Sequence, residues 1–281
     1  GGGSGGGSGS GGGSGGLAEN HRSLLATLRL TLGLSSTWAL CLQYSGVSTM
    51  TNSARFFLPT LLSEVYPDLR PWHVGLVFAV PAVAKVILAP TLATWADGGG
   101  GGRHRVATWV GLGAAALSML LAGGWVRHKG CCAPAMSLTP ALVVGLVVLA
   151  DVVTQAAIPT HWALHHTTQP AALRGCSIAV VNSIGNLGGF LGPFMLGAMH
   201  DAAPSASCGK CLAQWGGGLF CVGAYLAAAT ALSRLALLRY APTPKASPVE
   251  LVGCSGDSQG SGQTSPRSDP GSLPAAGMHV V

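Results

Sequence analysis

The chain has 281 residues, of which 48% are hydrophobic and only 9% are charged, and its mean hydropathy is +0.47. A soluble domain carries roughly 25% charged residues, so this chain has too few charges to cover a surface that faces water. Its 15 basic and 9 acidic residues give a formal charge of +6, but the basic residues are dispersed. The composition therefore excludes a nucleic-acid-binding protein and a disordered chain, and it favours an integral membrane protein.

The two ends of the chain differ in composition from its middle. Residues 1–16 contain only Gly and Ser, as a linker or a low-complexity loop does, and residues 17–29 are expected to be a cytoplasmic lead-in. Residues 241–281 are rich in Ser, Gly and Pro and are expected to be a disordered cytoplasmic tail. Because the first residue is Gly rather than Met, we expect the chain to be a piece of a longer protein.

Six apolar runs occupy residues 30–240, and each is long enough to cross a hydrocarbon core of about 30 Å as a helix. Short core helices of soluble proteins rarely contain 18 uncharged residues in succession. The sequence therefore predicts an all-α membrane protein with six transmembrane helices. In chain order, the runs are residues 30–54, 74–96, 106–126, about 133–161, 175–199 and 212–233.

The distribution of basic residues predicts the orientation. With six spans, both termini and the second and fourth loops lie on one side, which carries Arg22, Arg29, Arg103, Arg105, Arg174, Arg234, Arg239 and Lys245. The opposite side carries Arg70, Arg127, Lys129 and Lys210. Because basic residues are enriched on the cytoplasmic side, both termini are expected to be cytoplasmic.

Polar residues inside the runs are the strongest functional signal, because a charge at the centre of a membrane helix costs about 2.5–3.5 kcal/mol on insertion scales. Arg55 ends the first run, Lys85 lies midway along the second, and Asp151 lies deep in the fourth. Asn182 and Asn186 are four residues apart in the fifth run and share a helical face. The third and sixth runs contain no internal charge, so they are expected to face lipid or to serve packing.

These residues allow more than one interpretation. Arg55 and Lys85 could line a cavity and bind an anionic substrate together with the two asparagines, although Lys85 could also extend toward a membrane interface. Asp151 could couple transport to a proton, or it could form a structural salt bridge with Lys85.

The fifth run is dense in glycine. Gly185 with Gly189, and Gly188 with Gly192, each form a pair of small residues four apart, which lets helix backbones approach closely in lipid. The four glycines are therefore predicted to pack against another helix, and Pro193 is predicted to allow a kink.

Cysteine and histidine patterns indicate neither a metal site nor a cofactor. Two loops on the non-cytoplasmic side contain cysteines that could form a disulfide where that side is oxidising, namely Cys131, Cys132, Cys208 and Cys211. His161, His165 and His166 have a spacing that could hold a metal, but no acidic or thiol ligand is nearby, which favours an interfacial helix end. No Ser-His-Asp order, H-E-x-x-H pattern or P-loop indicates an enzyme.

The segment PTHWALHHTTQPAALRGCSIAVVNSIGNLGGFLGPFMLGAMHD, residues 159–201, resembles the tenth and eleventh helices of the major facilitator superfamily, in particular its anion:cation symporter branch. FFLPTLLSE, residues 56–64, is similar to the end of the seventh helix. GLVFAVPAVAK, residues 75–85, with WADGGGGGRHR, residues 95–105, is similar to the eighth helix and the cytoplasmic loop that follows it.

The resemblance covers the C-terminal six-helix half of a twelve-helix transporter. It implies that the first, second, fourth and fifth spans line a central cavity, and that Asp97, Arg103 and Arg105 belong to a gating loop. It also implies a secondary transporter that moves a small organic anion with a cation, expected to be a proton, in a lipid bilayer with a second six-helix half. The alternative is a degenerate half with a structural or regulatory role in the membrane.

Overall fold

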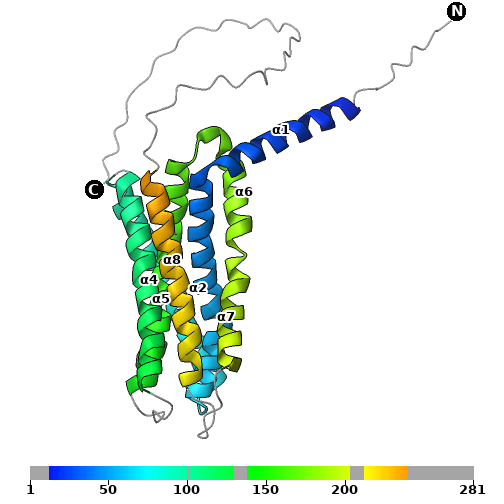
Figure 1. Cartoon of the computed structure of the whole chain (residues 1–281). Coiled ribbons are helices and arrows are strands. Elements are labelled where there is room, and N and C mark those ends of the chain that lie inside the picture. Colours follow the sequence, from blue (N-terminus) through cyan, green and yellow to red (C-terminus); the bar gives the residue numbers. More distant parts are fainter. Residues whose placement is uncertain (1–12, 100, 130–137, 203–211, 240–281) are drawn as a thin grey trace, which may run out of the picture. The chain divides into compact units, whose positions relative to one another are not determined.

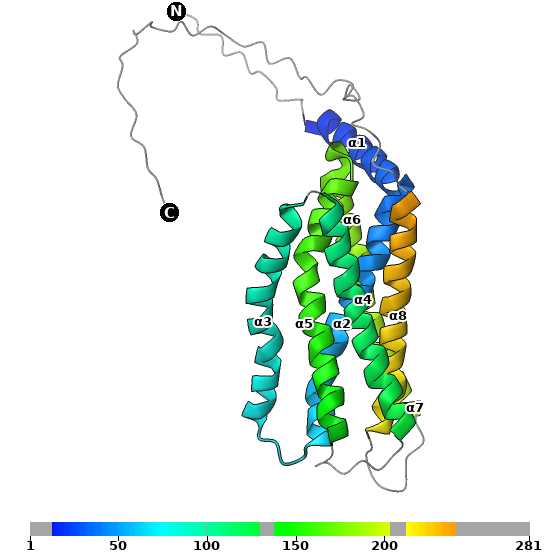
Figure 2. The same ribbon diagram turned by 90° about the vertical axis from the view of Figure 1, so that its left-hand side faces the viewer.

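The computed structural model describes residues 13–99, 101–129, 138–202 and 212–239, and within these residues every regular element is a helix (Figure 1). Helices α2 to α8 run side by side, whereas α1 leaves one end of the bundle at an angle, and Figure 2 shows the same bundle from a second direction. In chain order, the elements are α1 (Gly13–Gly33), α2 (Ser35–Val65), α3 (Pro71–Asp97), α4 (Gly101–Lys129), α5 (Leu138–Thr168), the 3-10 turn η1 (Ala171–Leu173), α6 (Arg174–Gly185), α7 (Gly188–Ala202) and α8 (Ala213–Arg239).

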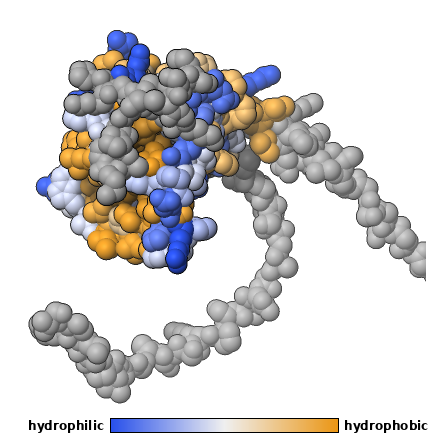
Figure 3. Space-filling view, turned by 90° about the horizontal axis from the view of Figure 1, so that it is seen from below, coloured by the Kyte–Doolittle hydropathy of each residue, from blue (hydrophilic) through white to orange (hydrophobic). Residues whose placement is uncertain are grey.

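Five segments of the described chain are long and apolar enough to cross a membrane, and the number is six if the bent pair of α1 and α2 counts as one span. α6 and α7 count as one of these segments, spanning Ala171–Ala202. Hydrophobic side chains cover much of the bundle where it is seen from below Figure 1 (Figure 3). The all-α membrane fold predicted from the six apolar runs is therefore confirmed.

The first predicted span differs from the structure at both ends. The chain bends by 76° at Leu34, between α1 and α2, so the upright helix begins at Ser35 rather than at residue 30. It then continues to Val65, with Pro59 inside it. Membrane helices tolerate an internal proline because neighbouring groups satisfy the backbone that it leaves free. Arg55 therefore does not end a span but lies ten residues before the end of α2.

Helix α2 lies at the centre of the bundle and packs against α5, α6, α7 and α8. Its side chains Leu40, Met50 and Leu61 are completely or almost completely buried. They alternate with buried Ser and Thr residues, whose small size permits close helix approach in lipid. This central helix therefore supplies contacts to most of the elements that carry the candidate functional residues.

Helices α4 and α8 approach closely through glycines that the predicted glycine face did not include. A Cβ atom on Gly123 would overlap the backbone of α8, and one on Gly223 would lie 2.8 Å from the backbone nitrogen of Leu120. The expectation of packing for the third and sixth apolar runs agrees with this geometry, because each of these helices is partly buried by the other.

Helix α3 is the least buried of the candidate spans, and it lies at one edge of the bundle in Figure 2. It starts at Pro71, where the missing N–H and the fixed φ of proline suit the first helical position. Its buried residues are only Pro81, Ala89 and Ala96, and its main partner is α5. Most of its aliphatic surface is therefore left to lipid or to another protein segment.

The fifth predicted span is interrupted at Asn186 and Leu187, between α6 and α7, a break that the sequence analysis did not predict. The backbone N–H of Gly189 bonds to the carbonyl of Asn186 at 2.9 Å, and the N–H of Phe190 bonds to that of Leu187 at 3.1 Å. These short-range bonds replace the regular α-helical ladder at the break, while Pro193 lies inside α7.

Two ends of the bundle can be told apart by their basic residues. Arg29, Arg103, Arg105, Arg174, Arg234 and Arg239 lie toward the end that carries the α3–α4 and α5–α6 connections, whereas Arg70 and Arg127 lie toward the other. This bias supports the proposal that the first end is cytoplasmic.

A labelling experiment tests that orientation. Cysteine placed at Gly102, an exposed position with open space around it, should react only with a reagent that reaches the cytoplasm, whereas cysteine at the exposed Asp68 should react from outside. The unsubstituted chain, which contains 8 cysteines, measures the background. Labelling of Gly102→Cys from outside would overturn the proposed orientation.

Candidate functional site: charges and amides at mid-depth

Three charged residues lie near the middle of their helices. Arg55 is ten residues from the end of α2, Lys85 is twelve residues from the end of α3, and Asp151 is thirteen residues from the start of α5. At 1.5 Å per residue, these separations correspond to about 15–20 Å. Such depths make extension of the side chain to either membrane interface unfavourable, and intramembrane charges normally face a partner or a water-filled space.

The three charges belong to one electrostatic group. The carboxylate of Asp151 is 8% exposed and interacts with both Arg55 and Lys85, as well as with the side chain of Gln155 one turn later. The two cations are themselves exposed on α2 and α3. In the described part of the chain no direct ion pair joins them to Asp151, whose Oδ1 has no hydrogen-bond partner. With Asp151 ionised, the formal charges of the three residues sum to +1.

The two asparagines form a second polar group at the break between α6 and α7. The Asn186 side chain donates from Nδ2 to Oδ1 of Asn182 at 3.2 Å and accepts from the hydroxyl of Ser48 at 3.0 Å. Both asparagines are exposed, so each keeps polar atoms available to a ligand. Among the described residues, no hydrogen bond or ion pair joins this pair to Arg55, Lys85 or Asp151.

One face of α2 connects the two groups. Ser48, Asn52 and Arg55 follow one another at helical spacing, so they form a stripe. At the N-terminal end of this stripe, Ser48 forms a hydrogen bond with Asn186. At its C-terminal end, Arg55 interacts electrostatically with Asp151. Sequence reasoning did not select Ser48, Asn52 or Gln155. They could have been selected, because each is a polar residue one or two helical turns from a candidate site residue, namely Arg55 or Asp151.

The four glycines of the broken span all face α2. A Cβ atom on Gly188 would overlap the carbonyl group of Ser45, and one on Gly189 would lie 2.7 Å from Nδ2 of Asn52. Added Cβ atoms on Gly185 and Gly192 would also overlap α2, at Tyr44 and at Ser53 and Thr49. The hydroxyl of Thr49 donates to the carbonyl of Gly188 at 2.9 Å. Because these four glycines have no side chains, the α6–α7 break can pack directly against α2.

The expected gating loop is a tight turn at the end of α3. Its carboxylate, Asp97, lies 3.0 Å from Nε2 of His104, so its partner is this histidine and not an arginine. Arg103 instead donates to the carbonyl of Trp95 at 3.4 Å and lies over the Trp95 ring. Arg105 is half-buried and takes no part in these contacts. The sequence analysis did not select His104, because it assigned the gating loop to the two arginines on either side of it.

His165 and His166 lie in the last turn of α5, in agreement with the helix end favoured from sequence, and His161 and His165 are fully buried by neighbouring helices. They project between α5, α2 and α6, where Nδ1 of His161 lies 2.9 Å from Oε1 of Gln43 and Nε2 of His165 lies 2.9 Å from the hydroxyl of Ser177. Only His166 is exposed. Periodicity could not show this burial, because it depends on which helices cover α5.

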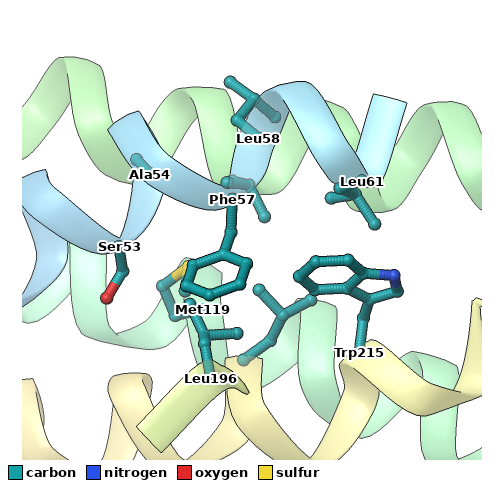
Figure 4. Close-up of a pocket in the computed structure, with 10 residues that line it drawn as sticks. Ser53, Ala54, Phe57, Leu58, Leu61, Met119, Leu196 and Trp215 are labelled. Carbon is teal, nitrogen blue, oxygen red and sulfur yellow. The ribbon is translucent and has the colours of Figure 1, made fainter. Parts of the chain in front are cut away.

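A small apolar cavity lies lower in the bundle, between α2, α4, α5, α7 and α8 (Figure 4). The rings of Phe57 and Trp215 meet across it edge to face, with centroids 5.6 Å apart. The Trp215 indole N–H donates to Glu64 at 2.9 Å, which fixes the ring. The volume of the cavity, about 10 Å³, has room for about one water molecule, so the cavity is a packing defect and not a substrate site.

No cluster of three or more potential ligands suited to a metal ion occurs among the described residues. Cys41, Cys176 and Cys221 are free thiols. The cysteines considered for a disulfide, Cys131, Cys132, Cys208 and Cys211, lie outside the described residues.

The fold and the site together define a multi-pass membrane protein with polar and charged residues at mid-depth, as transport proteins have. Comparison with known proteins agrees with that class. Two proteins of Agrobacterium vitis, each named "Putative tartrate transporter", are similar to the chain, at 30% identity over 204 residues and 31% over 206. Each alignment covers 73% of this chain, and the chain spans about two fifths of the length of these relatives (40% and 41%). No protein-family model matches the chain.

Proposed function

We propose that the chain forms part of a secondary active transporter that moves a small organic anion together with a cation, for which a proton is the strongest candidate. The observation that carries this proposal is the group of Arg55, Lys85 and Asp151 at mid-depth, with its local charge of +1. An anion compensates that charge, whereas a cation or a neutral solute does not. The similarity to transporters favours this function over a purely structural role in the membrane.

A small dicarboxylate suits this geometry. Tartrate, named for the two relatives, carries a carboxylate at each end, and Arg55 and Lys85 offer two cationic groups on different helices. The exposed amides of Asn182 and Asn186 could bond hydroxyl groups of such a substrate from the α6–α7 side. Asp151 is the proton-coupling candidate of this site, because its protonation would raise the local charge and strengthen anion binding.

The proposed mechanism is alternating access by the major facilitator superfamily fold, of which this chain would supply the C-terminal half. α2, α3, α5 and α6–α7 would line the cavity, and a second six-helix segment would supply the opposite wall. The length of the relatives supports this arrangement, since more than half of each lies outside the matched region. The Asp97–His104 pair and the Arg103–Trp95 contact would brace the cytoplasmic turn during the movement.

Tartrate binding to the full chain in lipid nanodiscs tests the proposal. Calorimetry should detect binding, and Arg55→Ala should weaken it about tenfold or more, because a hydrogen bond to a charged group contributes about 1.5–3 kcal/mol. Arg239→Ala removes an exposed arginine at a helix end and should leave the affinity unchanged. Equal binding by wild type and Arg55→Ala would contradict a substrate role for Arg55. The absence of any binding of tartrate or other small carboxylates would contradict an anion site in this chain.

A further inference from the structure

A second group of titratable side chains lies buried about 15 Å further along α5 than Asp151, a separation of ten residues. It consists of His161 and His165, with Gln43 on α2 and Ser177 on α6. His161, His165, Gln43 and Ser177 are all 0% exposed. Buried polar atoms are almost always hydrogen-bonded, so the atoms of this group that have no partner need an explanation.

The hydrogen bond between His161 and Gln43 determines which ring nitrogen of His161 carries the hydrogen. Oε1 of Gln43 is a carbonyl oxygen and can only accept, so Nδ1 of His161 must donate across the 2.9 Å distance. In the neutral imidazole the other nitrogen, Nε2, then carries a lone pair and no hydrogen. Nε2 of His161 has no hydrogen-bond partner among the described residues. It is therefore a basic site, held in a fixed orientation and unoccupied by any protein donor.

Two aromatic rings cover His161. The ring of Tyr44 stacks on the imidazole with centroids 5.4 Å apart, and the indole of Trp162 meets it edge to face at 5.2 Å. Tyr44 and Trp162 are themselves only half-buried. The two rings therefore separate His161 from the exterior of the bundle.

We propose that His161 is a proton-binding site of this chain, which accepts a proton on Nε2 and acts in addition to Asp151. This inference rests on the proposed function in that the proton would be the coupling ion. Proton uptake forms an N–H bond at Nε2 and converts the neutral ring to an imidazolium. Gln43 is a positioning residue, because its carbonyl keeps Nδ1 protonated and directs the lone pair to Nε2.

The charges around His161 explain how proton binding would be coupled to anion binding. Among the described residues, the titratable and charged groups that interact with this cluster are Tyr44 from α2, His165 and His166 from α5 and Arg174 from the start of α6. None of them is acidic. A buried imidazolium without a counter-charge is unfavourable, so protonation of His161 favours the arrival of an anion, and a bound anion favours protonation. This reciprocity is the requirement for symport.

Nitrogen NMR of the full chain in nanodiscs tests proton binding directly. His161–Trp162 is the only His-Trp pair among the 9 histidines of the sequence. Labelling His uniformly with carbon-13 and nitrogen-15, and Trp with nitrogen-15 at its amide, therefore assigns the His161 ring signals through the Trp162 amide without any substitution. At about pH 8 the ring should be neutral with hydrogen on Nδ1, and on acidification Nε2 should gain a proton. Added tartrate should move this step to higher pH. Gln43→Leu should mix the two neutral forms, whereas His73→Gln on α3, which takes no part in the contacts of this cluster, should change nothing.

Two results of this titration would overturn the proposal. One is a neutral ring with hydrogen on Nε2, because no lone pair would then be free at that atom. The other is an Nε2 that stays unprotonated down to about pH 4, with and without tartrate, well below the ordinary range of histidine. Neither result depends on whether the chain transports an anion.

Transport in proteoliposomes separates this inference from the proposed function. If the wild-type chain accumulates tartrate under an inward proton gradient, His161→Gln should lose accumulation while downhill movement continues, and His73→Gln should behave like wild type. Normal accumulation by His161→Gln would overturn the coupling role. If the wild-type chain moves no anion, the proposed function fails while the NMR titration still decides whether His161 binds a proton.

Discussion

Replacing Gly188 by alanine should reduce the amount of folded protein in the membrane about tenfold, and replacing it by leucine should reduce the amount further. A Cβ atom at this position would overlap the backbone carbonyl of Ser45 and lie 2.8 Å from the hydroxyl oxygen of Thr49. A carbonyl of the central helix cannot rotate away as a side chain can, so α7 must move from α2. Overpacking of this kind typically costs 1–3 kcal/mol, and about 1.4 kcal/mol corresponds to a tenfold change.

The matched control is Gly113→Leu in α4, where an added Cβ would meet open space and the position is exposed. The yield of monodisperse protein after detergent extraction measures both variants. Gly113→Leu should match the wild type. Normal yield of Gly188→Leu would show that α7 does not need close approach to α2, contrary to the geometry of the break.

The second large effect is expected at Lys85. Lys85→Ala should reduce anion uptake or binding at least a hundredfold while membrane insertion stays normal or improves, because the substitution removes a cation from mid-depth. The competing interpretation is that Lys85 only neutralises Asp151, with which it interacts electrostatically. Removal of Lys85 would then harm the protein by leaving the carboxylate uncompensated.

A double-mutant cycle distinguishes the two roles of Lys85. Lys85→Ala, Asp151→Ala and the double variant are compared with wild type in the same uptake or binding assay, at equal amounts of folded protein. We expect the double variant to remain inactive, because the substrate has lost its cation. Full recovery in the double variant would show that Lys85 and Asp151 form a structural pair.

Much of the architecture could be predicted because lipid imposes a simple rule on the sequence. A span needs about 20 apolar residues, and this requirement alone located the helices now seen as α3, α4 and α8. The mid-depth charges were equally visible, since a charge within an apolar run is conspicuous in the sequence. The electrostatic grouping of Arg55 and Lys85 with Asp151 required the structure, because three separate helices contribute one residue each.

The features that sequence reasoning missed depend on contacts between helices. Leu34, where the chain bends by 76°, is an ordinary apolar residue in an apolar run. At the break, the Thr49 hydroxyl of α2 donates to the backbone carbonyl of Gly188, and the Ser48 hydroxyl donates to the side chain of Asn186. His161 lies on a face of α5 whose burial follows only from the positions of α2 and α6. In each case the local sequence was compatible with several backbone conformations or degrees of burial, and the packing of neighbouring helices determined which one forms.

The position of α3 has a consequence for the synthesis of the protein. α3 packs mainly against α5, and Asp151 of α5 follows Lys85 by 66 residues along the chain. At ribosomal rates of about 5–20 residues per second, this corresponds to an interval of roughly 3 to 13 s. During that interval the nascent chain contains Lys85 but not yet the carboxylate with which it interacts. Nascent α3 therefore depends on local water, lipid headgroups or the insertion machinery to shelter Lys85 until α5 is made.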